Sequence, residues 1–84
     1  MDKMDFAILD VLLNTNSTTK ISAISLKTML INLDIPYSTL YRRIAGLLSE
    51  GYIEKGIMES SGNTYFINSK GAEILEGVMK WKIK

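Results

Sequence analysis

The stretch YSTLYRRIAGLLSEGYIEK, residues 37–55, carries the pattern that decides the fold. Its first part spaces apolar residues at i, i+4, i+7 and i+8, which predicts a helix over 37–50 with one buried face. These residues are Leu40, Ile44, Leu47 and Leu48. Gly51 follows, and glycine readily adopts the left-handed conformation in which helices end. After it the period changes, and residues 52–59 are strand-like. A helix that leads directly into a strand is therefore expected at the centre of the chain.

A second helix is expected immediately before this one. Ser25 is a favoured N-cap for a helix over 26–33, whose apolar residues fall on one face. Those residues are Leu26, Met29, Leu30 and Leu33. The Asp-Ile-Pro sequence at 34–36 ends this helix, because the residue before a proline avoids the α conformation. Two helices joined by so short a turn match a helix-turn-helix.

A β-hairpin and a last helix complete the second half of the chain. The turn-forming residues 60–63 separate the strand at 52–59 from residues 64–67, which are β-branched and aromatic. Asn68 or Ser69 caps a final helix over 69–82. A two-stranded hairpin is not stable alone in water, so it must pack on the helices.

The N-terminal segment predicts a helix over 3–14, with Asp2 as N-cap and Asp5 in its first turn. A short strand is expected at 20–24. The whole chain of 84 residues is too short for a second domain. We therefore expect a single α+β domain over 1–84 that is mostly helical.

The N-terminal helix has apolar residues on two sides, whereas a surface helix usually has one apolar stripe. A second copy of the chain could cover the extra side, together with one side of the last helix. The candidate dimer-interface residues are Met4, Ile8, Val11, Ile74, Val78 and Trp81. The alternative is that both sides pack inside one domain.

Three motifs in order resemble the winged helix-turn-helix of transcription regulators of the MarR, PadR and ArsR kind. In those families a Ser-Thr pair opens the second helix, as Ser38-Thr39 does here, and basic residues follow, as at Arg42-Arg43. The helix then ends in a Leu-x-x-x-Gly-Tyr/Leu-Ile step, here residues 47–53. Residues 65–71, YFINSKG, resemble the entry into the last helix, with Asn68 where the family has Thr.

This resemblance implies a three-helix core, a two-stranded β-wing and a C-terminal helix. It also implies a sequence-specific regulator of transcription, a repressor, that binds double-stranded DNA with helix 37–50 in the major groove. One departure concerns the wing tip, where the family usually has Arg or Lys. Residues 59–64 read ESSGNT, in which only Asn63 could contact a base edge.

The helical wheel places small and polar residues opposite the buried stripe of helix 37–50, with Arg42 at the centre of that face. Arginine reads guanine bidentately or binds phosphate. Ser38 and Thr39 lie where a helix N-terminus favours phosphate, although they could simply cap the helix. The candidate DNA-binding residues are Tyr37, Ser38, Thr39, Tyr41, Arg42, Arg43, Lys55 and Asn63.

Several of these residues have a plainer explanation. Arg42 could be a solvated surface residue, and Arg43 could pair with Glu50 on the next turns of the helix. The aromatic rings of Tyr37 and Tyr41 could pack at the rim of the core instead of contacting phosphate.

The formal net charge of +1 is the sum of separate cationic and acidic segments of the chain. Residues 37–49 contain two arginines and no acidic residue, whereas residues 50–79 contain two lysines and five glutamates. Three lysines lie within the last five residues. The near-balance of the whole chain therefore does not argue against nucleic-acid binding, because the candidate helix is purely cationic before its last residue, Glu50.

The absence of cysteine and histidine excludes disulfides, a cysteine nucleophile and metal sites that need these ligands. No catalytic constellation, cofactor motif, targeting signal or membrane span is apparent, so we expect a cytoplasmic protein that is not an enzyme. The alternative to a DNA-binding regulator is a winged-helix module for protein–protein interaction, which the acidic wing favours.

Overall fold

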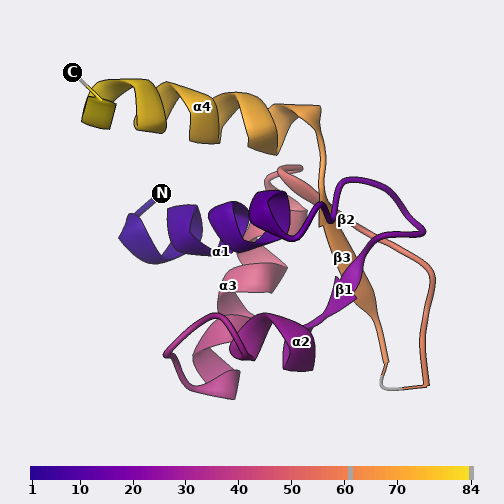
Figure 1. The fold of residues 1–84 in the computed structure, drawn as a ribbon. Helices are drawn as coiled ribbons and strands as arrows, with labels where there is room; N and C mark the ends of the chain where they lie inside the picture. The colour runs from indigo at the N-terminus through magenta and orange to yellow at the C-terminus, as the bar shows by residue number, and fades with distance from the viewer. Residues whose placement is uncertain (61, 84) are drawn as a thin grey trace.

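The computed structural model describes residues 1–60 and 62–83 of the chain (Figure 1). Four helices and three strands follow one another in the order α1, β1, α2, α3, β2, β3, α4. Their bounds are α1 Lys3–Asn14, β1 Ile24–Ser25, α2 Leu26–Leu30, α3 Tyr37–Ser49, β2 Ile53–Lys55, β3 Thr64–Ile67 and α4 Ser69–Ile83. The element order predicted from the sequence is confirmed.

The N-terminus of α1 is closed by a capping box. The Asp2 carboxylate accepts hydrogen bonds from the backbone N–H groups of Met4 and Asp5, and the Asp5 carboxylate accepts one from the N–H of Asp2. These bonds satisfy amide groups that have no partner within the helix. The prediction of Asp2 as N-cap and of a helix over 3–14 is confirmed.

The helix-turn-helix is formed by α2 and α3, but α2 is shorter than predicted. Ser25 caps it by accepting a hydrogen bond from the N–H of Thr28, as expected. After Leu30 the backbone forms i to i−3 hydrogen bonds instead, from Ile31 to Thr28 and from Asn32 to Met29. These tighter turns replace the last turn of the predicted helix before the chain reaches Pro36.

The hairpin is confirmed, and β1 joins it to make a three-stranded antiparallel sheet of order β1-β3-β2. The central strand β3 pairs Tyr65 with Ile24 on one side and Ile67 with Ile53 on the other. The predicted strand at 20–24 is wrong for residues 20–23, where Ser22 Oγ accepts hydrogen bonds from the N–H groups of Thr18 and Thr19 and bends the chain.

The predicted strand over 52–59 is also too long, because β2 ends at Lys55. Beyond it, the Ile57 N–H donates to the Lys20 carbonyl in the loop before β1. Gly56 permits this approach, since a Cβ there would lie 2.3 Å from the Ala23 Cβ. The chain after β2 therefore packs on that loop instead of extending the strand.

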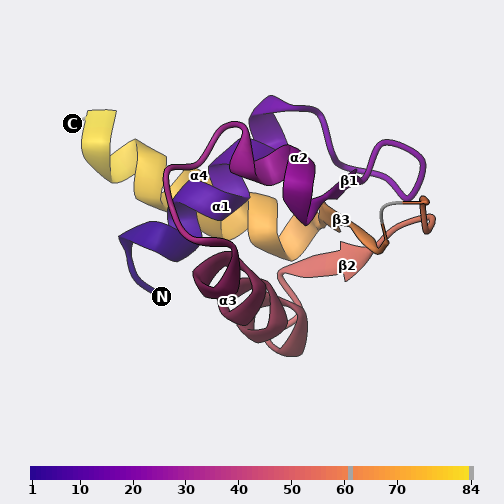
Figure 2. The ribbon, with the colours of Figure 1, turned by 90° about the horizontal axis from the view of Figure 1, so that it is seen from below.

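The core lies between the three N-terminal helices, α4 and the sheet. It contains Ile8, Leu9, Val11, Leu12, Leu26, Met29, Leu40, Ile44, Leu47, Ile53, Tyr65, Ile67 and Leu75. Figures 1 and 2 show α4 along one side of α1, and α1 also contacts α2 and β3. Both apolar sides of α1 are therefore covered within one chain.

This arrangement corrects the predicted dimer interface. Ile8 is fully buried and Val11 is 9% exposed, so neither can contact a partner. Met4 and Ile74 are half-buried against the core, and Val78 is also half-buried. The Trp81 side chain lies outside the described residues, as do the side chains of the C-terminal lysines.

Hydrogen bonds around Gly51 connect the end of α3 to the start of α4, just before β2 begins. Gly51 has φ +80°, the left-handed conformation predicted for it. The Asn68 side chain donates to the Gly51 carbonyl at 2.7 Å and accepts from the N–H of Gly71 at 2.9 Å, so Asn68 caps α4. Lys70 Nζ donates to the Glu50 carbonyl at 2.7 Å, where a cation stabilises the helix C-terminus.

Within the part of the chain that the structure describes, no helix combines the length and apolar character required to cross a membrane.

Candidate nucleic-acid interface

The outward face of α3 is the surface on which the candidate residues converge. Figure 2, viewed from below, shows α3 on the outside of the molecule with β2 beside it. Leu40, Ile44 and Leu47 are buried, whereas the opposite face is exposed. That face presents Tyr37, Ser38, Tyr41, Arg42, Ala45, Gly46 and Ser49. Small side chains along the second half allow the helix backbone to approach another surface closely.

The N-terminus of α3 is not capped by a side chain. Pro36 occupies the N-cap position and makes no side-chain hydrogen bond there. Ser38 and Thr39 follow inside the first turn, so they do not serve as N-caps. Their hydroxyls and the first-turn amides lie at the positive end of the helix dipole, which favours an anion.

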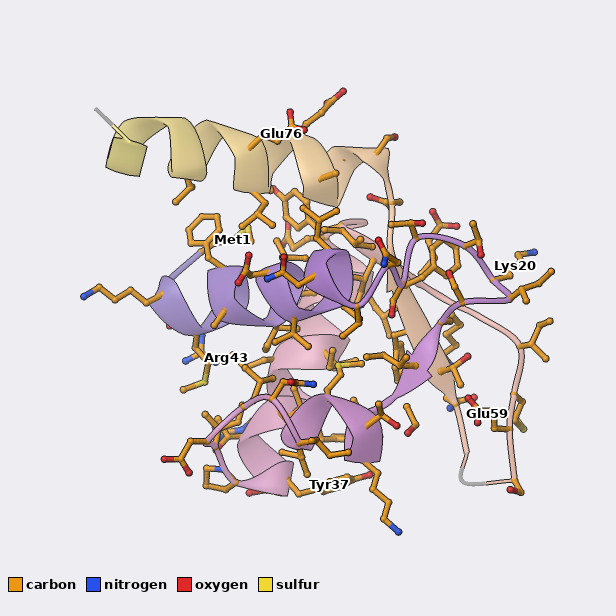
Figure 3. All side chains as sticks on the ribbon, viewed as in Figure 1. Met1, Lys20, Tyr37, Arg43, Glu59 and Glu76 are labelled. Carbon is orange, nitrogen blue, oxygen red and sulfur yellow. The ribbon has the colours of Figure 1, made fainter. Side chains whose placement is uncertain are left out.

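The two arginines of α3 have different environments. Arg43 Nη1 lies 2.6 Å from an Asp2 carboxylate oxygen and 3.5 Å from one of Asp5. Figure 3 shows Arg43 beneath the first turns of α1. The hydrogen bond with Asp2 raises the pKa of Arg43. Arg43 therefore connects α3 to α1, and the alternative pairing with Glu50 is not what the structure shows.

Arg42 is exposed on the outward face. Over residues 1–60 and 62–83, the ion pairs of the arginines involve Arg43 alone. Arg42 is thus the cation of α3 that is available to an external ligand.

Two aromatic rings occupy the first turns of the same face. Tyr37 and Tyr41 are 55% and 59% exposed, and their ring centroids lie 6.5 Å apart at an interplanar angle of 28°. Figure 3 places Tyr37 at the end of α3 remote from Arg43. The two rings are therefore not rim residues covered by the core, as one interpretation of the sequence had it.

A groove of about 500 Å³ lies beside these rings. It is lined by Ser25, Leu26, Lys27, Tyr37, Tyr41, Gly62, Asn63 and Tyr65. The groove thus brings the start of α2, the start of α3 and the turn of the hairpin to one place. Burial raises the pKa of the Tyr65 phenol, while a hydrogen bond with the Asn63 side chain opposes this shift.

A second groove, of about 490 Å³, lies along the other side of α3. Arg42, Gly46 and Ser49 line it together with Asp5 and Glu50. Because carboxylates border this side, it is less suited to a polyanion than the side next to Lys27.

Solved structures of similar architecture are known. TubR from Bacillus megaterium pBM400 matches with a TM-score of 0.84 at 13% sequence identity, over 94% of this chain and 87% of that chain. F93 from STIV, a winged-helix DNA-binding protein, matches with a TM-score of 0.77 at 22% identity, over 96% and 88%. The fold is a winged helix. No family model and no curated protein sequence matches the chain.

A third similar structure is the DNA-binding TubR fragment from Clostridium botulinum, with a TM-score of 0.75 at 23% identity, over 93% of this chain and 96% of that chain. These likenesses confirm the predicted fold class. The closer resemblance to regulators of the MarR, PadR and ArsR kind stays a prediction.

The wing of this fold, residues 53–67, carries the remaining candidate residues. Lys55 is exposed on β2 and pairs in register with Tyr65, which lines the groove. Asn63 is exposed and lines the groove itself. Glu59 and Gly62 exchange backbone hydrogen bonds of 2.9 Å that close the turn. The structure therefore brings Asn63 close to the two exposed tyrosines, which the sequence could not show.

Lys27 is a groove residue that the sequence analysis did not select. It is exposed and lies in the first turn of α2, directly before the helix that carries the other candidate residues. Its position in the first turn after the N-cap Ser25 could have indicated this role, because the first turn of α2 lines the same groove as the start of α3.

Proposed function

We propose that this protein is a sequence-specific double-stranded DNA-binding regulator of transcription that inserts α3, the recognition helix, into the major groove. One observation carries the proposal: the recognition helix exposes a narrow face with a free arginine and no acidic residue from Tyr37 to Ser49. Its fold, shared with proteins described as DNA-binding, supports the same conclusion.

Five of the candidate residues, together with Lys27, have a role in this proposal. Arg42 contacts a guanine edge or a phosphate from the middle of the helix. Ser38, Thr39 and the uncapped amides bind a phosphate at its start. Lys27 and Lys55 bind phosphates of the flanking backbone, and Asn63 contacts the same strand from the wing. So few cations predict a shallow dependence of affinity on salt.

Fluorescence anisotropy with a mixed-sequence duplex tests the proposal. We expect binding at about 50 mM salt that weakens at about 200 mM salt. Lys27→Gln should weaken binding and reduce the salt slope by about 1. Lys20→Gln is the matched control, because Figure 3 shows Lys20 in the loop before β1, away from the recognition helix. Absence of binding at low salt, or an equal loss in both variants, contradicts the proposal.

We infer further that the protein acts as a homodimer. One free arginine on each recognition helix provides few contacts, and two copies would double them on half-sites about one helical turn apart. Ile74 and Val78 are one turn apart on α4 and half-buried, and Met4 of α1 is half-buried as well. These three residues form the proposed α1–α4 edge. It replaces the interface predicted from the sequence, because Ile8 and Val11 are buried.

Repression is the regulatory outcome that we propose. A domain seated in the major groove excludes other proteins from the same site, and this requires no additional contact with the transcription machinery.

A second candidate function is a protein–protein interaction module. Ile57 and Met58 of the wing are 58% and 70% exposed, next to the acidic Glu59. Exposed apolar side chains on the wing are unsuited to a phosphate backbone and suited to a protein surface. A protein that fails to bind any duplex at low salt would favour this candidate.

A further inference from the structure

The exposed tyrosine pair has no role in the phosphate contacts proposed above. Tyr37 and Tyr41 are each more than half exposed to solvent. The two exposed rings lie next to each other, so they form one aromatic surface on the helix. Both lie on the outward face of the recognition helix, in the two turns that precede Ala45.

The two rings stack on each other at the edge of a groove. Their centroids are 6.5 Å apart in a stacked arrangement, and the groove that they line has Asn63 and Tyr65 on its wing side. Tyr65 is buried, so this side of the groove belongs to the core of the fold. Aromatic side chains have few rotatable bonds and therefore lose little conformational entropy on binding, which makes them effective contact residues.

The major groove of DNA offers one apolar group, the C5-methyl of thymine. Apart from ring C–H groups, the other groups on the base edges in that groove are hydrogen-bond donors or acceptors. A helix face that presents two aromatic rings and Ala45, with Arg42 as its free cation, therefore matches a base edge that carries methyl groups better than one rich in hydrogen-bonding groups.

We propose that Tyr37 and Tyr41 recognise thymine methyl groups in the major groove, so that the preferred DNA sites contain thymine beneath the first two turns of the recognition helix. This inference rests on the proposed duplex binding. It specifies which base feature the helix reads, whereas the proposed function leaves that open.

Matched duplexes that differ only in methyl groups test it. The probes are alternating dA–dT and dA–dU duplexes, and alternating dG–dC duplexes with cytosine or 5-methylcytosine. We expect affinity to rise about fourfold for each methyl contacted, in both pairs of duplexes. Equal binding to the dA–dT and dA–dU duplexes overturns the inference while duplex binding itself stands. Absence of binding to all four duplexes overturns the proposed function as well.

Variants then assign the effect to the rings. Tyr41→Ala and Tyr37→Ala should reduce the preference for methylated duplexes, and the double variant should abolish it. Tyr41→Phe retains the ring and should retain the preference. Ile21→Ala removes an apolar side chain that is 86% exposed outside the recognition helix and should change nothing. A methyl preference that survives in the double variant overturns the assignment to Tyr37 and Tyr41.

Discussion

Arg43 Nη1 lies 2.6 Å from a carboxylate oxygen of Asp2, the residue that caps α1. This contact joins residues 41 positions apart in the sequence. It uses one of the two arginines of the recognition helix to hold that helix against the N-terminus of α1. Of the two arginines of α3, only Arg42 is therefore free, within the described part of the chain, to contact a ligand.

Substituting the two arginines one at a time should separate stability from binding. Arg42→Gln should reduce duplex affinity by about tenfold, since a lost base or phosphate contact costs about 1–3 kcal/mol. Its melting temperature should not change, because Arg42 is exposed on the open face of α3. Arg43→Gln should instead lower the melting temperature and have the smaller effect on affinity. Anisotropy and thermal unfolding by circular dichroism measure the two effects. If both variants lose the same affinity and have the same melting temperature, Arg42 and Arg43 do not have the separate roles in binding and stability that we infer.

The ion pair also predicts a dependence of stability on pH. Hydrogen bonds from the Asp5 N–H and then from Arg43 lower the pKa of Asp2 below its ordinary value of 3.8. A lowered pKa stabilises the folded state above pH 3.8, and this contribution is lost as the pH falls through the lower folded-state pKa. The melting temperature of the wild type should therefore exceed that of Asp2→Asn at neutral pH, and the difference should shrink below pH 3.8.

Asn is itself a good N-cap, so Asp2→Asn removes the charge and keeps the cap. Arg43→Gln serves as the second reference, because in that background the difference between Asp and Asn at position 2 should be smaller. A difference between wild type and Asp2→Asn that stays constant down to about pH 2.5 would exclude the ion pair as a source of stability.

Local sequence signals predicted much of this fold correctly. The helix over 3–14, the strand over 64–67 and the positions of Ser25 and Gly51 follow from caps, periodicity and turn residues within a few positions. The outward face of α3 was also predicted, because the periodicity of its buried stripe determines which residues lie opposite.

The failures concern contacts between distant segments. The two apolar sides of α1 are visible in the sequence, but not that α4, α2 and β3 cover them. Nothing near Arg43 in the sequence marks Asp2 as its partner. The groove likewise depends on the hairpin turn reaching the start of α3, which brings Asn63 to Tyr37 and Tyr41. Periodicity shows that a face is apolar or polar, and only the tertiary structure shows what lies against it.

Gly71 should not tolerate a side chain. A Cβ at this position of α4 would lie 2.3 Å from the Tyr52 carbonyl oxygen, a backbone atom that cannot rotate away. We expect Gly71→Ala to destabilise the protein by about 1–3 kcal/mol, the usual cost of overpacking.

The control is Gly77→Ala in the same helix, where nothing lies within 4 Å of the added Cβ. It should stabilise the protein by about 1 kcal/mol through helix propensity. Urea unfolding measures both, and changes of the same sign would refute this packing.

The proposed homodimer predicts a specific pattern of self-association. Sedimentation equilibrium of the 9.4 kDa chain at about 100 µM should give the mass of a dimer. Val78→Glu places a charge on the proposed α1–α4 edge and should give monomers, because a buried unpaired carboxylate is costly. Gly77→Glu introduces the same charge one residue away, at an exposed position, and should stay dimeric. Circular dichroism confirms that both variants are folded.

Since two recognition helices bind together only in a dimer, Val78→Glu should also weaken duplex binding, most strongly at low protein concentration. A monomeric wild type, or dimers that persist in Val78→Glu, would exclude this edge as the interface.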